Sequence, residues 1–252
     1  MTMERPLWPV PKAVGLGWTT REGGHSEAPF NNNNQAHHVG DAPAAVEANR
    51  ADLLAGMAGC ERICWLSQVH GTRVVAAETA TVGAEADAAT VSQPGIAAAV
   101  MTADCLPVFF WQDDGAQVAI AHAGWRGLAA GILAETLQQF SDPNRVRCGL
   151  GPAIGPGAFE VGMDVIDAFS NWPGASRCFK PAGSPGKWLA DLPQLAEFWL
   201  QEAGVPAVYR TKVCTFTDAE HYYSYRRDGT TGRMVNVIWR RTDADFPGGR
   251  CG

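Results

Sequence analysis

Three apolar stretches of the chain are each broken at glycine or proline, and each break carries one soft metal ligand. The breaks lie at residues 67–71, 102–107 and 121–127, and they contain His70, Cys105 and His122. Short apolar runs that end at turn residues are typical of buried strands. Functional side chains commonly lie on the loops that join such rigid elements. We therefore expect these three side chains to lie on loops held by buried strands.

Two imidazoles and one thiolate form a set of three metal ligands. Catalytic zinc sites use three protein ligands and leave the fourth position open for water or substrate. Cys105 and His122 are also the residue types that a thiol nucleophile and its histidine base require. A third interpretation is plain packing, because free cysteine is often buried as a small hydrophobe. The spacing alone is compatible with all three interpretations.

The composition is that of a compact enzyme and not of a protein that binds nucleic acid or membranes. Of the 252 residues, 46% are hydrophobic and 18% are charged, which allows a sizeable core. The formal net charge of −6 argues against nonspecific binding to nucleic acid or acidic membranes. No apolar run approaches the roughly 20 residues that span a bilayer. Arginines are nevertheless grouped at Arg226, Arg227 and Arg233, with Arg126 and Arg21 alone, which suits either a small anionic ligand or ordinary surface ion pairs.

Cysteine usage indicates a reducing compartment. The chain has seven cysteines, an odd number, and no CxxC pair. That pattern does not resemble a disulfide framework. Residues 1–14 contain three prolines and no long apolar core, so we expect neither a signal peptide nor a membrane anchor. The expected location is cytoplasmic.

Hydrophobic periodicity predicts strands and helices that do not alternate regularly. Predicted strands cover 117–122, 146–150 and 234–239, while predicted helices cover 42–57, 125–140 and 192–204. His122 then ends a strand just before a helix, where the helix N-terminus favours anions. We predict a single α+β domain over residues 1–252, with mixed β-sheets and packed helices.

Two carboxylates are candidates for proton transfer, Asp104 and Glu160. Because Asp104 precedes Cys105, it is alternatively a hydrogen-bond partner of a metal-binding histidine. The adjacent His37 and His38 are more typical of a solvated loop than of a metal site.

Aromatic residues beside arginines suggest one wall of a nucleobase site. Trp125 precedes Arg126, and the segment from Phe216 to Tyr225 precedes Arg226. Stacking combined with guanidinium contacts suits a purine and its sugar or phosphate. Aromatic residues are equally common as core filling, so the pattern alone leaves both interpretations open.

Taken together, the motifs resemble one family over almost the whole chain. They are SQVHG at 67–71, VMTADCLP at 100–107, AHAGWRG at 121–127, LGPAIGP at 150–156 with FEVG at 159–162, and SYRRDG at 224–229 with TGR at 231–233. TREGG at 20–24 and HVGD at 38–41 also match. This set resembles the bacterial laccase-domain family. Its members are labelled polyphenol oxidases, or purine nucleoside phosphorylases with adenosine deaminase activity.

The resemblance implies an α+β fold related to the bacterial toxin cysteine deamidases, and a zinc ion held by His70, Cys105 and His122. It implies phosphorolysis of adenosine, inosine, guanosine and methylthioadenosine, together with deamination of adenosine. Cys105, Asp104 and Glu160 would then be catalytic. Contacts to nucleoside or phosphate are expected from Arg21, Asn34, Gln68, Arg126, Phe216, Tyr225 and Arg226. The expected partners are therefore a small nucleoside and phosphate. The sequence does not define the oligomeric state and is compatible with a monomer.

Two alternatives to the zinc enzyme follow from the same residues. One is a copper-dependent polyphenol oxidoreductase, with Met101 as a weak axial ligand. A multicopper oxidase needs several centres with many histidine ligands, and this chain has six histidines in total. The other is a thiol hydrolase or amidase that uses Cys105 with His122.

The chain departs from the family pattern in one segment. The family usually has SLNLG before the HVGD motif, whereas residues 32–36 read NNNQA. Asn34 keeps its register, but its apolar neighbours and the glycine are replaced. We expect this loop to be arranged differently.

Overall fold

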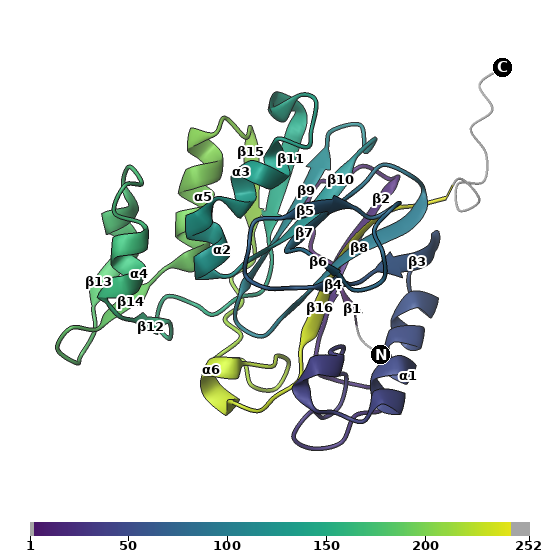
Figure 1. The fold of residues 1–252 in the computed structure, drawn as a ribbon, viewed down its shortest axis with the longest axis horizontal. Coiled ribbons are helices and arrows are strands. Elements are labelled where there is room, and N and C mark those ends of the chain that lie inside the picture. Colours follow the sequence, from purple (N-terminus) through teal and green to yellow (C-terminus); the bar gives the residue numbers. More distant parts are fainter. Residues whose placement is uncertain (1–2, 243–252) are drawn as a thin grey trace.

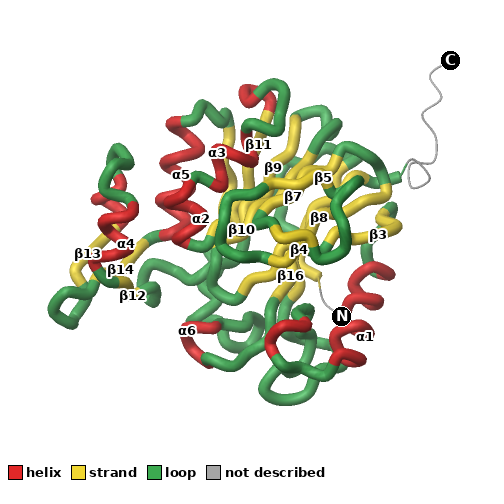
Figure 2. Tube along the Cα trace, in the orientation of Figure 1, coloured by secondary structure: helices red, strands yellow, loops and turns green. Residues whose placement is uncertain are grey.

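Two mixed β-sheets packed face to face form the body of the protein, which we describe from a computed structural model over residues 3–242 (Figure 1, Figure 2). The five-stranded sheet contains, in spatial order, β1 (Met3–Glu4), β2 (Val14–Thr19), β16 (Met234–Arg240), β8 (Gly95–Thr102) and β3 (Cys60–Cys64). The six-stranded sheet contains β15 (Ala207–Arg210), β11 (Val146–Leu150), β9 (Leu106–Gln112), β10 (Val118–Ala123), β7 (Ala88–Val91) and β5 (Val74–Ala76). Both sheets combine parallel and antiparallel pairs, as predicted.

The core between the sheets follows from the period-two alternation of the strands. In β9, Phe109 and Trp111 point to the inner layer, whereas Val108 and Phe110 point to the outer face. Strand β8 alternates in the same way, with Val100 on the inner side. Successive side chains of a strand point to opposite faces of the sheet. Both faces are therefore buried, because the other sheet covers one and helices cover the other.

Helices cover the outer face of each sheet. Helix α1 (Pro43–Ala55) packs Leu53 against the five-stranded sheet. Helices α2 (Trp125–Ala130), α3 (Ile132–Leu137) and α5 (Leu192–Glu202) cover the six-stranded sheet. The predicted segment 125–140 is thus two short helices. Gly131, with φ of 101°, ends α2 in the left-handed region, where a residue without Cβ is favoured.

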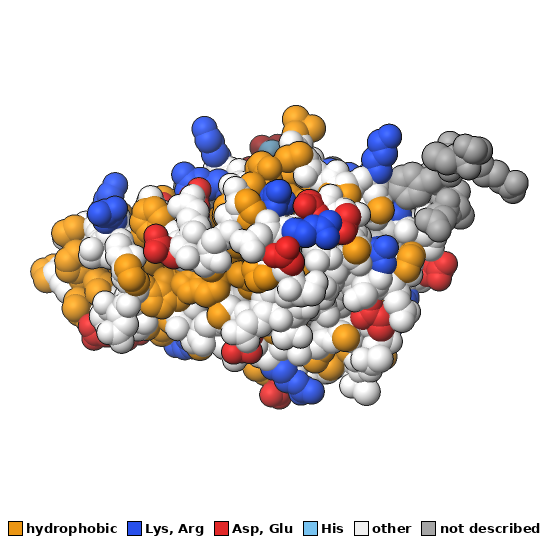
Figure 3. All heavy atoms as spheres, turned by 90° about the horizontal axis from the view of Figure 1, so that it is seen from above, with side chains coloured by type: hydrophobic (Ala, Val, Ile, Leu, Met, Phe, Trp, Pro, Cys, Tyr) orange, Lys and Arg blue, Asp and Glu red, His pale blue; other side chains and the backbone are white. Residues whose placement is uncertain are grey.

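Smaller elements project from this body. A three-stranded sheet of β12 (Glu160–Val161), β14 (Trp188–Ala190) and β13 (Phe179–Pro181) lies with α4 (Met163–Ala168) at one end of the molecule (Figure 1). Hydrophobic side chains gather at this end on the face seen in Figure 3. The short pair β4 (Leu66–Ser67) and β6 (Ala84–Glu85), helix α6 (Tyr225–Asp228) and the 3-10 turn His37–Val39 lie near the predicted site.

The sequence analysis also predicted no membrane-spanning segment and no disulfide framework. No helix within residues 3–242 is long and apolar enough to cross a membrane. The six cysteines in that range are free thiols, and Cys251 lies outside the described residues.

Candidate functional site

The three predicted ligands meet at one end of the six-stranded sheet. The pairing of β9 with β10 places His122 opposite Pro107, next to the turn that carries Cys105. The loop after β4 brings His70 to the same point, with its ring centroid 4.7 Å from that of His122. The ligand atoms of the three residues lie within 4.8 Å of one another, and the Cys105 Sγ atom is 3.8 Å from His70 Nε2.

The backbone is unusual at two points of this cluster. His70 and Asp104 have φ of 60° and 95°, and they are the non-glycine residues of the described chain with positive φ. That conformation costs a non-glycine residue of order 1–3 kcal/mol, so the surrounding structure must hold it in place. Left-handed turns at these two residues direct the loops of His70 and Cys105 toward each other.

Asp87 holds the cluster together, and the sequence analysis missed it. Its fully buried carboxylate accepts the N–H groups of Val69 at 3.1 Å, His70 at 3.0 Å and Gly71 at 2.7 Å. The same carboxylate accepts Nδ1–H of His122 at 2.8 Å. His122 therefore presents Nε2 to the cluster, in the arrangement common for metal-binding histidines. The signal in the sequence was a lone carboxylate in the apolar segment 86–89, because a buried charge must be paired.

The electrostatics of the cluster favour a thiolate. Burial raises the pKa of Cys105, but the charge and hydrogen bonding of His122 outweigh it, so the pKa lies below the usual thiol value. Burial lowers the pKa of His122, but the contacts with Cys105 and Asp87 outweigh this effect and raise the pKa to about 9. The pKa of Asp87 is lowered by hydrogen bonds from His122 and Gly71, which outweigh the effect of its burial. A thiolate is the form of cysteine that binds metals and attacks electrophiles.

The donor set is suited to one metal ion. Two imidazole nitrogens and one sulfur come from three separate segments and lie within 4.8 Å of one another. Gly124 leaves room beside them: a Cβ at this position would lie 2.9 Å from His70 Cδ2 and 3.0 Å from Cys105 Sγ. Zinc bonds of about 2.0–2.3 Å place such donors about 3–4 Å apart, which small side-chain rotations achieve from the observed positions.

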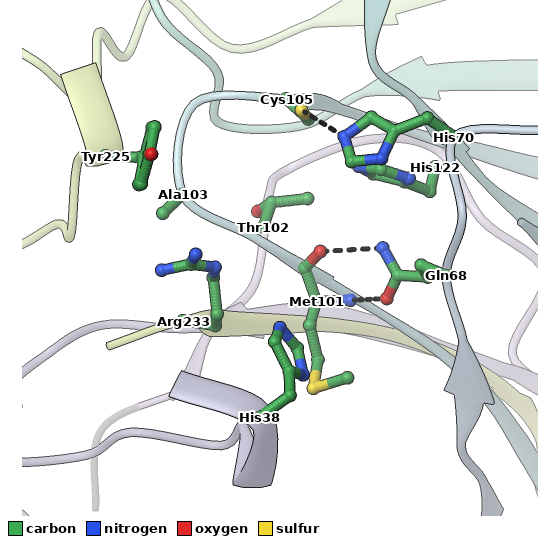
Figure 4. A pocket seen from close by; sticks show the side chains of 10 residues that line it. All are labelled: His38, Gln68, His70, Met101, Thr102, Ala103, Cys105, His122, Tyr225 and Arg233. Atoms are coloured by element: carbon green, nitrogen blue, oxygen red, sulfur yellow. Dashed lines mark hydrogen bonds between the residues drawn. The ribbon is translucent and has the colours of Figure 1, made fainter. Parts of the chain in front are cut away.

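A cavity of about 380 Å³ opens beside the cluster (Figure 4). Its size is typical of a small-molecule site. Its lining residues are His38, Gln68, His70, Met101, Thr102, Ala103, Cys105, His122, Tyr225 and Arg233. Of the residues predicted to contact substrate, Gln68 and Tyr225 line it. The Gln68 amide is occupied, because it donates to the Met101 carbonyl at 2.9 Å and accepts the Met101 N–H at 2.7 Å.

The two predicted acid–base residues do not line the cavity. The Asp104 carboxylate accepts the Thr215 hydroxyl and the Arg226 backbone N–H, each at 2.7 Å. It therefore anchors the start of α6, which carries Tyr225. The hydrogen-bond partner of the site histidine is Asp87 instead of Asp104. Glu160 is exposed on β12, and its backbone carbonyl accepts Arg226 Nη1 at 2.7 Å.

The remaining predicted contacts also lie outside the cavity lining. Arg21 donates to the carbonyls of Asn31 and Ala219, and its guanidinium lies over the Tyr223 ring. Arg126 is exposed, with its guanidinium 4.3 Å from the Trp125 ring centroid. Phe216 packs against the core on the helix-covered face of the six-stranded sheet, and Asn34 is fully buried.

His38 and Arg233 line the cavity without having been assigned to it from the sequence. Burial lowers the pKa of His38, and the nearby charges of Arg233 and Arg50 lower it further. The sequence placed Arg233 in an arginine group, but the group could not show which member faces the cavity. Its two arginine neighbours in sequence, Arg226 and Arg227, bind backbone carbonyls elsewhere.

Comparison with known proteins identifies the family of the chain. A family described as multi-copper polyphenol oxidoreductase laccase matches residues 15–241. The chain belongs to this laccase family. All three ligands, Asp87 and Arg233 lie within the matched range.

Relatives of this laccase-family chain are named as nucleoside enzymes. One from Pseudomonas aeruginosa, named a purine nucleoside phosphorylase, is 47% identical over 93% of this chain and 96% of its own. One of that name from Escherichia coli is 46% identical over 93% of this chain and 97% of its own. Among solved structures, a Neisseria meningitidis protein is 43% identical with a TM-score of 0.90, covering 95% of this chain and 99% of its own. YlmD from Geobacillus stearothermophilus is 30% identical with a TM-score of 0.87, over 95% of this chain and 99% of its own.

Proposed function

We propose that the protein is a zinc-dependent purine nucleoside enzyme. It cleaves adenosine, inosine, guanosine and methylthioadenosine with phosphate, and it deaminates adenosine. The observation that carries this proposal is the His70, Cys105 and His122 group, whose ligand atoms lie within 4.8 Å of one another beside a cavity of about 380 Å³. Relatives named purine nucleoside phosphorylases at 43–47% identity support the substrate class.

Zinc fits the donor set better than copper. Two imidazoles and a thiolate with an open fourth position are typical of catalytic zinc sites. A zinc ion bound there would supply Lewis-acid polarisation of a substrate oxygen. The three ligands, held by Asp87 and by the tight approach of Gly124, provide the geometry for it.

The chain's own residues supply binding and orientation. The Tyr225 ring, 61% exposed at the cavity, offers a face on which a purine can stack. Asp104 positions that ring by anchoring the first turn of α6. In phosphorolysis a phosphate oxygen forms a bond to the anomeric carbon while the bond to the purine nitrogen breaks. The purine leaves with the electron pair and takes up a proton.

A thiol hydrolase or amidase is the second candidate function. It is favoured by the lowered pKa of Cys105 and by the 3.8 Å separation of its Sγ from His70 Nε2. A toxin-type deamidase relationship would accord with that chemistry. A copper oxidoreductase is a third candidate, since Met101 lines the same cavity.

Product analysis separates these functions. The purified protein is incubated with adenosine, with and without phosphate, and the products are resolved by chromatography. Adenine with ribose-1-phosphate, formed only with phosphate, supports phosphorolysis, and inosine supports deamination. Chelation and Cys105→Ala should each abolish turnover, whereas Cys60→Ala on the edge strand β3 should leave it unchanged. Activity that survives chelation but not alkylation indicates the thiol enzyme, and dioxygen uptake with phenols indicates the oxidoreductase.

A further inference from the structure

We infer that Arg233 and His38 form a binding subsite for inorganic phosphate, on the side of the cavity away from the His70, Cys105 and His122 group. This inference rests on the proposed phosphorolysis and names where its second substrate is held. In Figure 4 the segment from Met101 to Ala103 lies between the two sides.

Arg233 forms no salt bridge within the described chain, although Cys105 and Asp104 lie close enough to favour its charged form. Its Nη1 atom donates to the carbonyls of Thr231 at 2.9 Å and Gly232 at 3.0 Å. Its Nε and Nη2 groups have no hydrogen bond, and no carboxylate lies within ion-pair distance, among residues 3–242. A partly buried cation is costly unless an anion compensates it. Arg145, by contrast, pairs with Asp113 and Asp114 on the surface.

The other residues that line the cavity are compatible with a bound anion. No Asp or Glu is among the residues that line it. His38 lies beside Arg233 (Figure 4), and burial together with the charge of Arg233 lowers the pKa of the His38 imidazole, which favours the neutral ring. A neutral imidazole donates one N–H group, which suits a phosphate oxygen. An arginine with a second donor is a common phosphate-binding arrangement.

Asn34 fixes the two residues relative to each other although they are far apart in sequence. Its Oδ1 atom accepts the backbone N–H of Arg233 at 2.9 Å and that of Ala36 at 3.0 Å. Its Nδ2 group donates to the Ala36 carbonyl and to Asp41 Oδ2, both at 2.9 Å. The turn that carries His38 lies between Ala36 and Asp41, so Asn34 joins that turn to the start of β16. Such a preformed site binds its ligand without reordering.

The other arginines near the site are already engaged. Arg50 donates twice to the Gln35 carbonyl, at 2.9 and 2.7 Å, and stacks on the Trp65 ring. The Arg226 side chain donates to the Glu160 carbonyl and lies against the Phe159 ring. Arg233 also lies 5.7 Å from the Tyr225 ring centroid. A purine stacked on Tyr225 and a phosphate at Arg233 would therefore flank one ribose.

Direct binding of inorganic phosphate tests the subsite without any turnover. The zinc-loaded protein, free of nucleoside, is titrated with phosphate by calorimetry, and kinetics are measured in parallel. Arg233→Met should weaken phosphate binding by about tenfold or more, the loss of one charge-assisted contact. It should raise the KM for phosphate far more than the KM for adenosine. Arg233→Lys, which keeps the charge, should recover part of both losses, and His38→Asn should give a smaller loss than Arg233→Met.

Arg226→Met and Arg126→Met are the matched controls, and both should bind phosphate as the wild type does. Equal phosphate affinity in wild type and Arg233→Met would overturn the subsite, as would a loss confined to Arg226→Met or Arg126→Met. Should Arg233→Met not fold, unchanged phosphate affinity and KM in Arg233→Lys and His38→Asn together would overturn it as well. Binding that depends on Arg233 without any nucleoside cleavage would uphold the subsite and refute phosphorolysis.

Discussion

Asp87 bonds directly to His122, accepting its Nδ1–H at 2.8 Å, and the same carboxylate accepts the backbone N–H of His70 at 3.0 Å. One fully buried residue thus sets the ring orientation of one ligand and the backbone of another. Val69 and Gly71 also donate their N–H groups to this carboxylate. These hydrogen bonds offset the conformational cost of the left-handed turn at His70. The geometry of the His70, Cys105 and His122 group therefore depends on a buried side chain outside the cavity lining.

Replacing Asp87 should weaken metal binding more than it alters the fold. Asp87→Asn keeps the shape but removes the charge that orients His122, and loss of such a partner typically costs about 10–100-fold in metal affinity. Competition with a coloured chelator measures the zinc affinity. Asp113→Asn, which removes a surface partner of Arg145, is the control and should bind zinc as the wild type does. Equal zinc affinity in the two variants would show that Asp87 has no orienting role.

Gly124→Ala should impair the metal site through contact alone. The added Cβ would lie 2.9 Å from His70 Cδ2 and 3.0 Å from Cys105 Sγ, too close for either ligand to stay in place. We expect roughly a tenfold or greater loss of zinc affinity, in the range seen when ligands are misoriented. Gly157→Ala is the matched control, because its Cβ would meet open space. Equal zinc affinity and equal melting temperatures in both variants would contradict the close approach at Gly124.

The sequence predicted many of the fold elements and singled out three residues that the structure brings together, because local patterns mark both. The break predicted at residues 102–107 does separate β8 from β9, and the predicted strand 146–150 matches β11. The helix after His122 was predicted as continuous, but Gly131 divides it, since a glycine within a periodic pattern does not reveal its φ. Local patterns therefore located the elements better than their ends.

The sequence patterns did not predict contacts between segments that are far apart in the chain. Asp104 was expected to act near Cys105, yet its side chain turns to Thr215, more than a hundred residues away. Asp87 and Arg233 gain their roles from packing that no spacing encodes. The members of the arginine group also differ in their surroundings. Arg226 and Arg227 donate to backbone carbonyls, whereas Arg233 lines the cavity.

The alkylation rate of metal-free Cys105 should stay nearly constant from pH 8 to pH 7. Its pKa lies below the usual thiol value because of His122, so the thiolate persists at neutral pH and is lost only as the pH falls through that lowered pKa. Burial raises the pKa of Cys60 to about 11, so its alkylation rate should fall about tenfold as the pH falls from 8 to 7. Mass spectrometry after iodoacetamide treatment measures both rates. Stoichiometric zinc should protect Cys105 but not Cys60, and an unprotected Cys105 would argue against its ligation.

Asp104 should behave as a positioning residue. Asp104→Asn weakens its hydrogen bonds to the Thr215 hydroxyl and the Arg226 N–H, and Thr215→Val removes the first of these. Because both changes loosen α6, both should reduce kcat/KM to a similar extent, about tenfold, with the pH profile unchanged. Proton transfer by Asp104 would instead give a loss of about 10²–10⁴-fold in Asp104→Asn alone. Steady-state kinetics across pH on both variants distinguish the two roles.

Zinc add-back tests the central claim most directly. The protein is stripped of metal, zinc is returned in steps, and phosphate-dependent release of adenine from adenosine is followed. Our account predicts that activity rises linearly and saturates at one zinc per chain, and that Cys105→Ala stays inactive throughout. Full activity of the stripped protein, or activity that returns with copper but not with zinc, would contradict it.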